Sequence, residues 1–297
     1  MTAFPTQYPD PTHRILHLSD THFVNARRPL YGAIDCDAQL ATLVERLHSS
    51  EIRPDAIVLT GDLADRGAED AYLRLRSALD PVATEYNCPI VWVMGNHDDR
   101  RAFRRILRDD VTGEGGPVDH VTMVDGLRII ALDSTVPGVH HGEITPDQLE
   151  WLSAELATPA PNGTLLALHH PPVPTHLGLL RAVELRDAHV LESVLAGSDV
   201  RGILAGHFHY SVSSTFAGIP VSVVSATCYS QDLLVAPGDS RAQNGGQGFA
   251  LVDVYPDRVV HAHMPLTEFD TVYAVSAEQL TAMLDPDAVS AVDLLSS

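Results

Sequence analysis

The chain has 297 residues, of which 45% are hydrophobic and 20% are charged; this length suits one large globular domain or two small ones and excludes bulk disorder. With 19 basic against 39 acidic residues the net charge is −20, which excludes a broad nucleic-acid-binding face and disfavours anionic membrane surfaces. Every basic residue is arginine, which excludes a Walker A lysine, a Schiff-base lysine and a kinase-type lysine.

Short apolar runs alternate with helical patterns after a proline-rich lead-in, residues 1–13, which we expect to be extended. The runs predict strands at Arg14–Leu18, Ala56–Thr60, Ile90–Met94, Leu127–Leu132, Thr164–Leu168 and Arg201–Ala205. Helical periodicity predicts helices at Asp37–Ser50, Glu69–Glu85, Arg100–Asp109, Thr145–Ala157 and Asp187–Ala196. The fourth helix opens with Thr145 and Pro146 and has Gln148 three residues after the cap, which predicts a capping box.

The last third of the chain is richer in strands. Further short runs predict a β-meander over Ser213–Phe216, Val221–Val224, Phe249–Val254 and Val259–His263. A glycine-rich loop is predicted at Ala236–Gln247, and a helix with a tail at Val275–Ser297. Two mixed β-sheets packed face to face with helices outside, an α/β (α+β) fold with the layer order αββα, accommodate both parts. We place the main domain at residues 14–264 and a C-terminal extension at residues 265–297.

The three cysteines, Cys36, Cys88 and Cys228, are scattered and form no CxxC pair. We therefore expect buried free thiols rather than disulfides or a thiolate zinc site. The first residues contain no apolar signal core, and no apolar run reaches the roughly 18 residues of a membrane span. These features predict a soluble cytoplasmic protein.

Five polar segments stand where predicted strands end. They are Asp20-Thr21-His22, Gly61-Asp62, Gly95-Asn96-His97-Asp98, His169-His170 and Gly206-His207-Phe208-His209. Because ligand sites in α/β sheets form beyond the carboxyl ends of strands, we expect these side chains to gather at one rim. Glycine precedes a candidate ligand in three of the segments, which permits a close backbone approach.

The donor types in these segments indicate a metal site. Carboxylate and amide oxygens occur together with imidazole nitrogens, a mixture that suits Mn²⁺, Fe or Zn²⁺ better than Mg²⁺ or Ca²⁺. Seven candidate ligands are too many for one catalytic ion with open positions. They suit two ions about 3.5–4 Å apart that share a bridging carboxylate.

The ordered set D-x-H, GD, GNHD, H and GHxH, over residues 14 to about 210, resembles the calcineurin-like metallophosphoesterase superfamily. The segments HLSDTH, LTGDLADRG, VWVMGNHDDR, LALHHPP, ILAGHFHYS and SATCY are similar to the class III cyclic-nucleotide phosphodiesterases, those of mycobacteria in particular. The resemblance implies that Asp62 bridges two metal ions. It also implies the remaining ligands, which are Asp20, His22 and His209 for one ion and Asn96, His169 and His207 for the other.

The mechanism implied by the resemblance is attack on phosphorus by a hydroxide that bridges the two ions. Catalytic roles then fall to Asp62 and to His97, as general acid or as donor to a phosphoryl oxygen. Asp98 either orients His97 or caps the next helix. His140 is either a solvated loop residue or lies over the substrate. The residues implied to contact substrate are Asn96, His97, His140 and His207.

The predicted function is hydrolysis of cyclic nucleotides, 3′,5′-cyclic AMP to 5′-AMP, by a dimetal phosphodiesterase. The same centre suits a broad phosphodiesterase acting on 2′,3′-cyclic nucleotides or other diesters, with phosphomonoesters third. A metal-poor scaffold of the same fold is disfavoured by the complete ligand set. Mn and Fe are the expected metals, with Zn open. The resemblance implies a homodimer, and contact between the C-terminal tail and a membrane surface stays open.

Overall fold

The computed structural model describes residues 7–111 and 115–283. The chain divides into two units. The larger is Pro11–Thr267 and contains both large β-sheets. The described part of the smaller unit comprises residues 7–10 and 268–283, and it includes helix α6 (Ala277–Met283).

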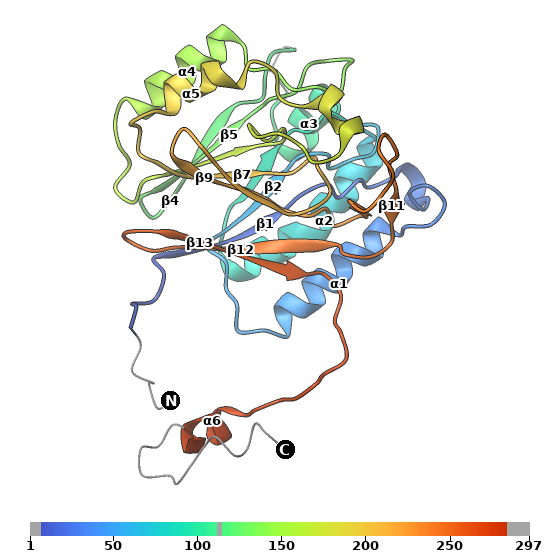
Figure 1. The fold of residues 1–297 in the computed structure, drawn as a ribbon, viewed down its shortest axis with the longest axis vertical. Helices are drawn as coiled ribbons and strands as arrows, with labels where there is room; N and C mark the ends of the chain where they lie inside the picture. The colour runs from blue at the N-terminus through green and yellow to red at the C-terminus, as the bar shows by residue number, and fades with distance from the viewer. Residues whose placement is uncertain (1–6, 112–114, 284–297) are drawn as a thin grey trace. The chain divides into compact units, whose positions relative to one another are not determined.

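The first sheet has five strands in the order β13-β12-β1-β2-β3 (Figure 1). Strands β1, β2 and β3 are parallel, whereas β12 runs antiparallel to β1 and to β13. Every residue of β2 is buried, as expected for a strand covered on both faces. The bounds are β1 His13–Leu18, β2 Ala56–Thr60, β3 Ile90–Val93, β12 Gly248–Val254 and β13 Val259–Pro265.

The second sheet has six strands in the order β4-β5-β6-β7-β9-β8. The four central strands β5, β6, β7 and β9 are parallel, and the two edge strands β4 and β8 are antiparallel to their neighbours. The bounds are β4 His120–Val124, β5 Leu127–Leu132, β6 Thr164–Leu168, β7 Val200–Ala205, β8 Val212–Phe216 and β9 Ile219–Val223.

An apolar core joins the two sheets. Ile15 and Val58 of the first sheet belong to one buried cluster with Ile129, Leu165 and Leu204 of the second. Each of these five side chains is completely buried. This apolar layer lies between the two sheets, and its removal from water stabilises their packing against each other. The sheets therefore form a single sandwich.

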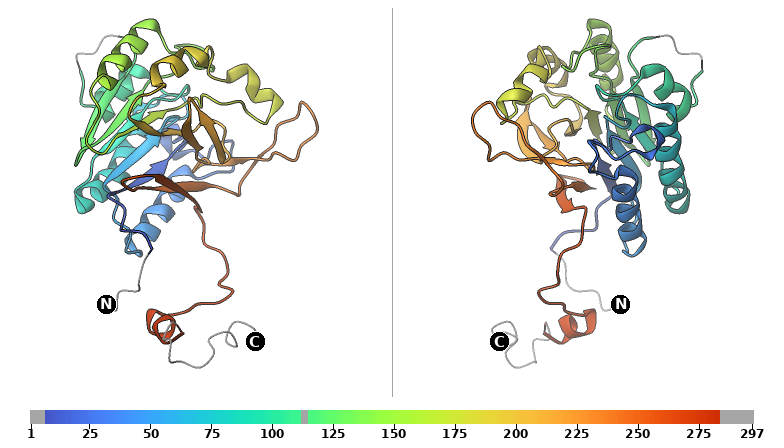
Figure 2. Two further views of the ribbon diagram at one scale, coloured as in Figure 1. Left: turned by 60° about the vertical axis from the view of Figure 1, so that its left-hand side comes forward. Right: turned by 90° about the vertical axis from the view of Figure 1, so that its right-hand side faces the viewer.

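Helices cover the two outer faces. Helices α1 (Cys36–His48), α2 (Glu69–Tyr86) and α3 (Arg100–Leu107) pack on the first sheet, and α4 (Pro146–Leu156) and α5 (Ala188–Leu195) pack on the second (Figure 1, Figure 2). Thr145 and Gln148 form the predicted capping box at the start of α4. The predicted αββα fold of two mixed sheets is confirmed.

Three details differ from the sequence prediction. Strand β4 was not predicted, because His120–Val124 is a partly exposed edge strand with no continuous apolar run. The predicted meander is wrong: the β8–β9 hairpin joins the second sheet and the β12–β13 hairpin joins the first. A two-stranded ribbon of β10 (Ser230–Gln231) and β11 (Ala242–Gln243) uses part of the predicted glycine-rich loop.

The ends of the parallel strands of both sheets meet at one edge of the sandwich. The imidazole Nδ1–H of His169, just after β6, donates to the Thr60 carbonyl at the end of β2 over 2.7 Å. The Gly206 N–H, just after β7, donates to the His169 carbonyl over 3.2 Å. The fold thereby brings the five polar segments together. Among the described residues, no helix combines the length and the hydropathy that a membrane crossing requires.

Candidate metal centre

A first donor cluster combines residues that follow strands of both sheets. It contains one donor atom each from Asp20, His22, Asp62 and His209, all within 4.8 Å of one another. His209 Nε2 lies 3.2 Å from Asp20 Oδ1, and His22 Nε2 lies 3.5 Å from Asp62 Oδ2. All four residues are buried. The structure therefore places the three ligands predicted for one ion around the predicted bridging carboxylate.

A second donor cluster lies on the other side of Asp62. His169 Nε2 is 3.4 Å from Asp62 Oδ2, 3.2 Å from Asn96 Oδ1 and 3.1 Å from His207 Nδ1. Asp62 Oδ2 thus belongs to both clusters, which is the arrangement of a bridging ligand. The seven predicted metal ligands are all brought together.

Backbone carbonyls fix which nitrogen of three histidines carries the proton. His169 Nδ1 faces the Thr60 carbonyl, His207 Nε2 faces the Val183 carbonyl at 3.0 Å, and His209 Nδ1 faces the Tyr229 carbonyl at 3.2 Å. Because a carbonyl can only accept, each of these nitrogens is the donor. In the neutral ring the opposite nitrogen, which points to the donor clusters, then carries the lone pair that a metal ligand requires.

The clusters fit a cation. His169 Nε2 and His207 Nδ1 lie 3.1 Å apart and both point into the clusters, so the pair can share either a proton or a bound cation. Asp20 Oδ1 and both His22 nitrogens are buried without a hydrogen bond. Burial opposes protonation of His169, but the carboxylates of Asp62 and Asp20 outweigh it and raise its pKa to about 9, so the centre attracts positive charge.

Five of the candidate ligands have an uncommon backbone conformation. Asp20, His22, Asp62, His207 and His209 all have φ between 44° and 71°. Left-handed backbone is unfavourable for residues other than glycine, and it concentrates at functional sites. Two preceding glycines are required by close packing, since a Cβ on Gly95 would lie 2.0 Å from Asp62 N and one on Gly206 would lie 1.8 Å from Ser19 Oγ.

His97 lies at the edge of the centre. Its backbone N–H donates to Asp62 Oδ1 over 2.8 Å, and its ring Nδ1 is 3.5 Å from Asp65 Oδ1. Burial opposes protonation of His97, but the Asp65 and Asp62 carboxylates outweigh it and raise its pKa. The side chain is 30% exposed, against 7% or less for the histidines of the two clusters. His97 can therefore reach a bound molecule without being a member of either cluster.

Asp65 was missed by the sequence analysis. Its Oδ1 lies 3.5 Å from Nδ1 of both His22 and His97, so it orients two imidazoles at once. The signal was a second carboxylate three residues after Asp62 in GDLADRG. Of the two roles predicted for Asp98, capping of the next helix is wrong, and its carboxylate makes no hydrogen bond to the His97 ring that would orient it.

Asp98 holds backbone instead. Its carboxylate accepts from the N–H groups of Leu63, Ala64 and Gly95 and from the Tyr72 hydroxyl. Asp99, not Asp98, caps α3 by accepting from the Ala102 N–H. Asp98 therefore ties the loop after β2 to the loop after β3.

His140 contacts the centre through Asn96. The Asn96 Nδ2–H donates to His140 Nδ1 over 2.9 Å, which directs the Asn96 oxygen toward His169. The His140 ring also lies 5.5 Å from the His97 ring. His170 has both ring nitrogens occupied, by Ser134 Oγ at 2.8 Å and by the His140 carbonyl at 3.1 Å. His170 thus supports the loop that carries His140.

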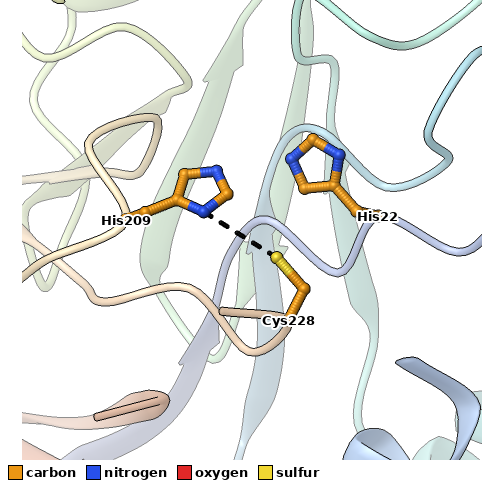
Figure 3. Close-up of side chains that lie close together, drawn as sticks. All are labelled: His22, His209 and Cys228. Atoms are coloured by element: carbon orange, nitrogen blue, oxygen red, sulfur yellow. Dashed lines mark hydrogen bonds between the residues drawn. The ribbon is translucent and has the colours of Figure 1, made fainter. Parts of the chain in front are cut away.

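The segment after β9 closes the first cluster. Cys228 is fully buried, and its Sγ lies 3.8 Å from His209 Nδ1 (Figure 3). Burial raises the pKa of this thiol well above its ordinary value, so it is a neutral neighbour of His209 and His22. The Tyr229 ring packs against the His209 ring with 4.2 Å between centroids. All three cysteines are free and buried, as predicted.

A sandwich of two mixed sheets that carries a carboxylate shared by two histidine-rich clusters defines a metallophosphoesterase. The chain belongs to the calcineurin-like phosphoesterase family, which matches residues 13–211, and it is thus an enzyme of a hydrolase family. A cAMP/cGMP dual specificity phosphodiesterase of Mycobacterium tuberculosis is 56% identical to it over 266 residues, 90% of this chain and 83% of the relative.

Two further comparisons agree. A 3′,5′-cyclic adenosine monophosphate phosphodiesterase of Escherichia coli is 35% identical over 217 residues, which cover 72% of this chain and 76% of the relative. The crystal structure of a dimetal phosphatase from Danio rerio has a TM-score of 0.59 at 17% identity and covers 87% of this chain and 98% of that chain. The second of these similarities concerns the fold alone.

Proposed function

We propose that this enzyme is a dimetal phosphodiesterase that hydrolyses 3′,5′-cyclic AMP to 5′-AMP. The observation that carries the proposal is the shared position of Asp62 Oδ2 between two donor clusters. Two cations side by side suit an anionic phosphodiester, because they offset the charge that develops on its oxygens. The names of the two bacterial relatives support a cyclic nucleotide as the substrate.

The proposed cofactors are two transition-metal ions, Mn or Fe, with Zn as the alternative. Asp20, His22 and His209 would hold one ion, and Asn96, His169 and His207 the other, with Asp62 between them. Carboxylate mixed with imidazole is a donor set that these metals accept. When bound, such ions polarise the phosphoryl oxygens and lower the pKa of water.

The protein's own side chains supply the remaining steps. His97 is exposed enough to reach the substrate and is held by Asp65, so it donates a proton to the leaving oxygen. His140 keeps the Asn96 amide oxygen pointed inward, and its ring lies 5.5 Å from that of His97, so the substrate phosphate would lie beside both. Asn96 and His207 would also contact that phosphate.

The test is hydrolysis of a panel of four substrates by the Mn²⁺-loaded enzyme. The panel contains 3′,5′-cyclic AMP, 2′,3′-cyclic AMP, an aryl phosphodiester and the corresponding monoester, at equal concentrations. We expect 3′,5′-cyclic AMP to be cleaved as fast as the best diester. If the other diesters are cleaved orders of magnitude faster, the enzyme is a general phosphodiesterase. No turnover with two bound metals would contradict the proposal.

We further propose a homodimer that works in the cytoplasm. The three free buried cysteines support a reducing compartment. Residues 14–264 would form the catalytic domain, with residues 265–297 as an extension. Analytical ultracentrifugation of the full chain tests the dimer, and co-sedimentation with anionic vesicles tests whether the extension contacts membranes.

A further inference from the structure

An exposed tyrosine lies on a loop between β1 and α1 that backbone hydrogen bonds close. Tyr31 is 70% exposed, and its φ of 52° lies in the left-handed region, which is uncommon for a bulky residue. The residues on either side are anchored: Leu30 and Ile34 are buried and exchange two backbone hydrogen bonds, of 2.8 and 3.1 Å. The fold thus maintains a strained backbone that holds an aromatic ring in solvent.

This ring is connected to the candidate metal centre through a second tyrosine. The Tyr31 and Tyr229 rings lie edge to face, with 5.7 Å between centroids and 64° between planes. Tyr229 is buried, and its ring lies 4.2 Å from that of His209 and 6.3 Å from that of His22. An aromatic path therefore runs from the first donor cluster to the surface and ends at Tyr31.

The geometry of this path suits a flat, uncharged ring on the substrate. An edge-to-face contact fixes the Tyr31 ring but leaves a face of it open, and an aromatic face binds nucleobases by stacking. A nucleotide whose phosphate lies at the metal centre would extend its base beyond the centre. Base–aromatic stacking contributes about 1–3 kcal/mol, which corresponds to roughly 5- to 150-fold in affinity.

We propose that Tyr31, supported by Tyr229, stacks on the base of the nucleotide substrate and thereby distinguishes nucleotides from other phosphodiesters. This inference rests on the proposed function. The structure also offers a different location for the base, a cavity of about 690 Å³ beside Gly95 and Asn96 that is lined by Arg100, Arg101 and Arg104. The experiment below separates the two locations.

The test compares two substrates with the full-length, Mn²⁺-loaded enzyme. One is 3′,5′-cyclic AMP, and the other is the same cyclic ribose phosphate without a base. Tyr31→Ala should raise KM for cyclic AMP at least about fivefold and leave kcat and the kinetics of the base-free substrate unchanged. Tyr31→Phe and Tyr31→Trp keep an aromatic face and should retain the wild-type KM to within about twofold.

Two further variants serve as controls. Tyr273→Ala removes another exposed tyrosine, outside the larger unit, and should change neither substrate's kinetics. Arg101→Ala tests the cavity beside Asn96. If Arg101→Ala raises KM for cyclic AMP and Tyr31→Ala does not, the stacking inference is wrong while the proposed function stands. If Tyr31→Ala affects both substrates equally, Tyr31 is structural and the inference is again wrong. Absence of cyclic AMP hydrolysis by the wild type overturns the proposed function and this inference together.

Discussion

The two sheets contribute different chemistry to the candidate metal centre. The strand ends of the five-stranded sheet provide three oxygen donors and one imidazole, from Asp20, Asp62, Asn96 and His22. Those of the six-stranded sheet provide imidazoles only, from His169, His207 and His209. Each donor cluster takes members from both sheets. Neither sheet alone holds all seven candidate ligands, so the two donor clusters form only when the sheets are packed.

This division also gives the two sides opposite electrostatic roles. Burial alone would raise the pKa of Asp20 and Asp62, but the neighbouring His209 and His169 outweigh it and lower both. The second sheet thus stabilises the charge that the first sheet buries. A direct link crosses the interface where the His207 backbone N–H donates to Asp20 Oδ2 over 3.0 Å.

The largest effect is expected from removing the carboxylate that both clusters share. Asp62→Ala should lose both metal ions and reduce turnover below detection, because each ion would lose the carboxylate that the two donor clusters share. His97→Ala should keep both ions and lose roughly 10²- to 10⁴-fold in kcat. Metal analysis of the purified proteins and steady-state rates measure both.

The different metal contents expected of these two variants distinguish a metal ligand, Asp62, from a proton donor, His97. Near-normal activity with two bound ions in Asp62→Ala would contradict the bridging assignment. Loss of metal from His97→Ala would make His97 a ligand and contradict its assignment as proton donor.

A smaller effect is expected where the strand ends of the two sheets touch. In Gly206→Ala the new Cβ would lie 1.8 Å from Ser19 Oγ and 2.7 Å from Asp20 Oδ2, so either these two side chains or the end of β7 must shift. We expect a loss of about 2 kcal/mol in unfolding free energy and at least about tenfold weaker metal binding. Urea unfolding and metal titration are the measurements.

The matched control for that variant is Gly178→Ala, since Gly178 is exposed and a Cβ at this position would have no neighbouring atom within 4 Å. It should leave both stability and metal affinity unchanged. Equal behaviour of the two variants would show that the contact between β7 and β1 does not position the ligands.

Much of the candidate metal centre was predictable from sequence, because the end of each buried strand is marked by the change from apolar to polar residues. A buried parallel strand is a short apolar run, and the polar residue that ends it is where a ligand is placed, as at Thr60-Gly61-Asp62. Helices α1 to α5 were predicted to within two residues at each end, for example Arg100–Leu107 against Arg100–Asp109. Local patterns therefore sufficed for these elements and for the set of residues at the rim.

The rest depended on contacts between distant parts of the chain. The carbonyls that fix the histidine protons, at Thr60, Val183 and Tyr229, leave no mark in the sequence because every residue has a carbonyl. Its position next to His97 in the sequence suggested that Asp98 orients that ring. In the structure its carboxylate instead accepts hydrogen bonds from the backbone of the loop after β2. Strand β4 was missed because this edge strand has no apolar run. Tertiary packing, which no local pattern shows, decides which sheet each hairpin joins.

The smallest predicted effect concerns a carboxyl on the six-stranded side that has no histidine to stabilise its charge. Asp119, just before β4, accepts from the Asp133 N–H over 2.7 Å and from Gln148 Nε2 over 3.0 Å. Burial raises its pKa to about 6; these two donors and Arg100 oppose the rise, and the Asp133 carboxylate adds to it. The shift is thus opposite to those of Asp20 and Asp62.

The sign of the resulting pH dependence follows from linkage. The folded state holds the Asp119 proton more tightly than the unfolded state, whose pKa is near 3.8, so this group stabilises the fold at low pH and loses that contribution as pH rises from about 4 through 6. Asp119→Asn keeps the accepting oxygen and removes the titration. Relative to wild type, the variant should gain about 2 kcal/mol in unfolding free energy between pH 4.5 and pH 7.5, measured by urea unfolding at both. Because variant and wild type are compared at the same pH, the titration of the buried histidines cancels. If the difference in unfolding free energy between the two proteins is the same at both pH values, the charge of Asp119 is already compensated in the folded protein.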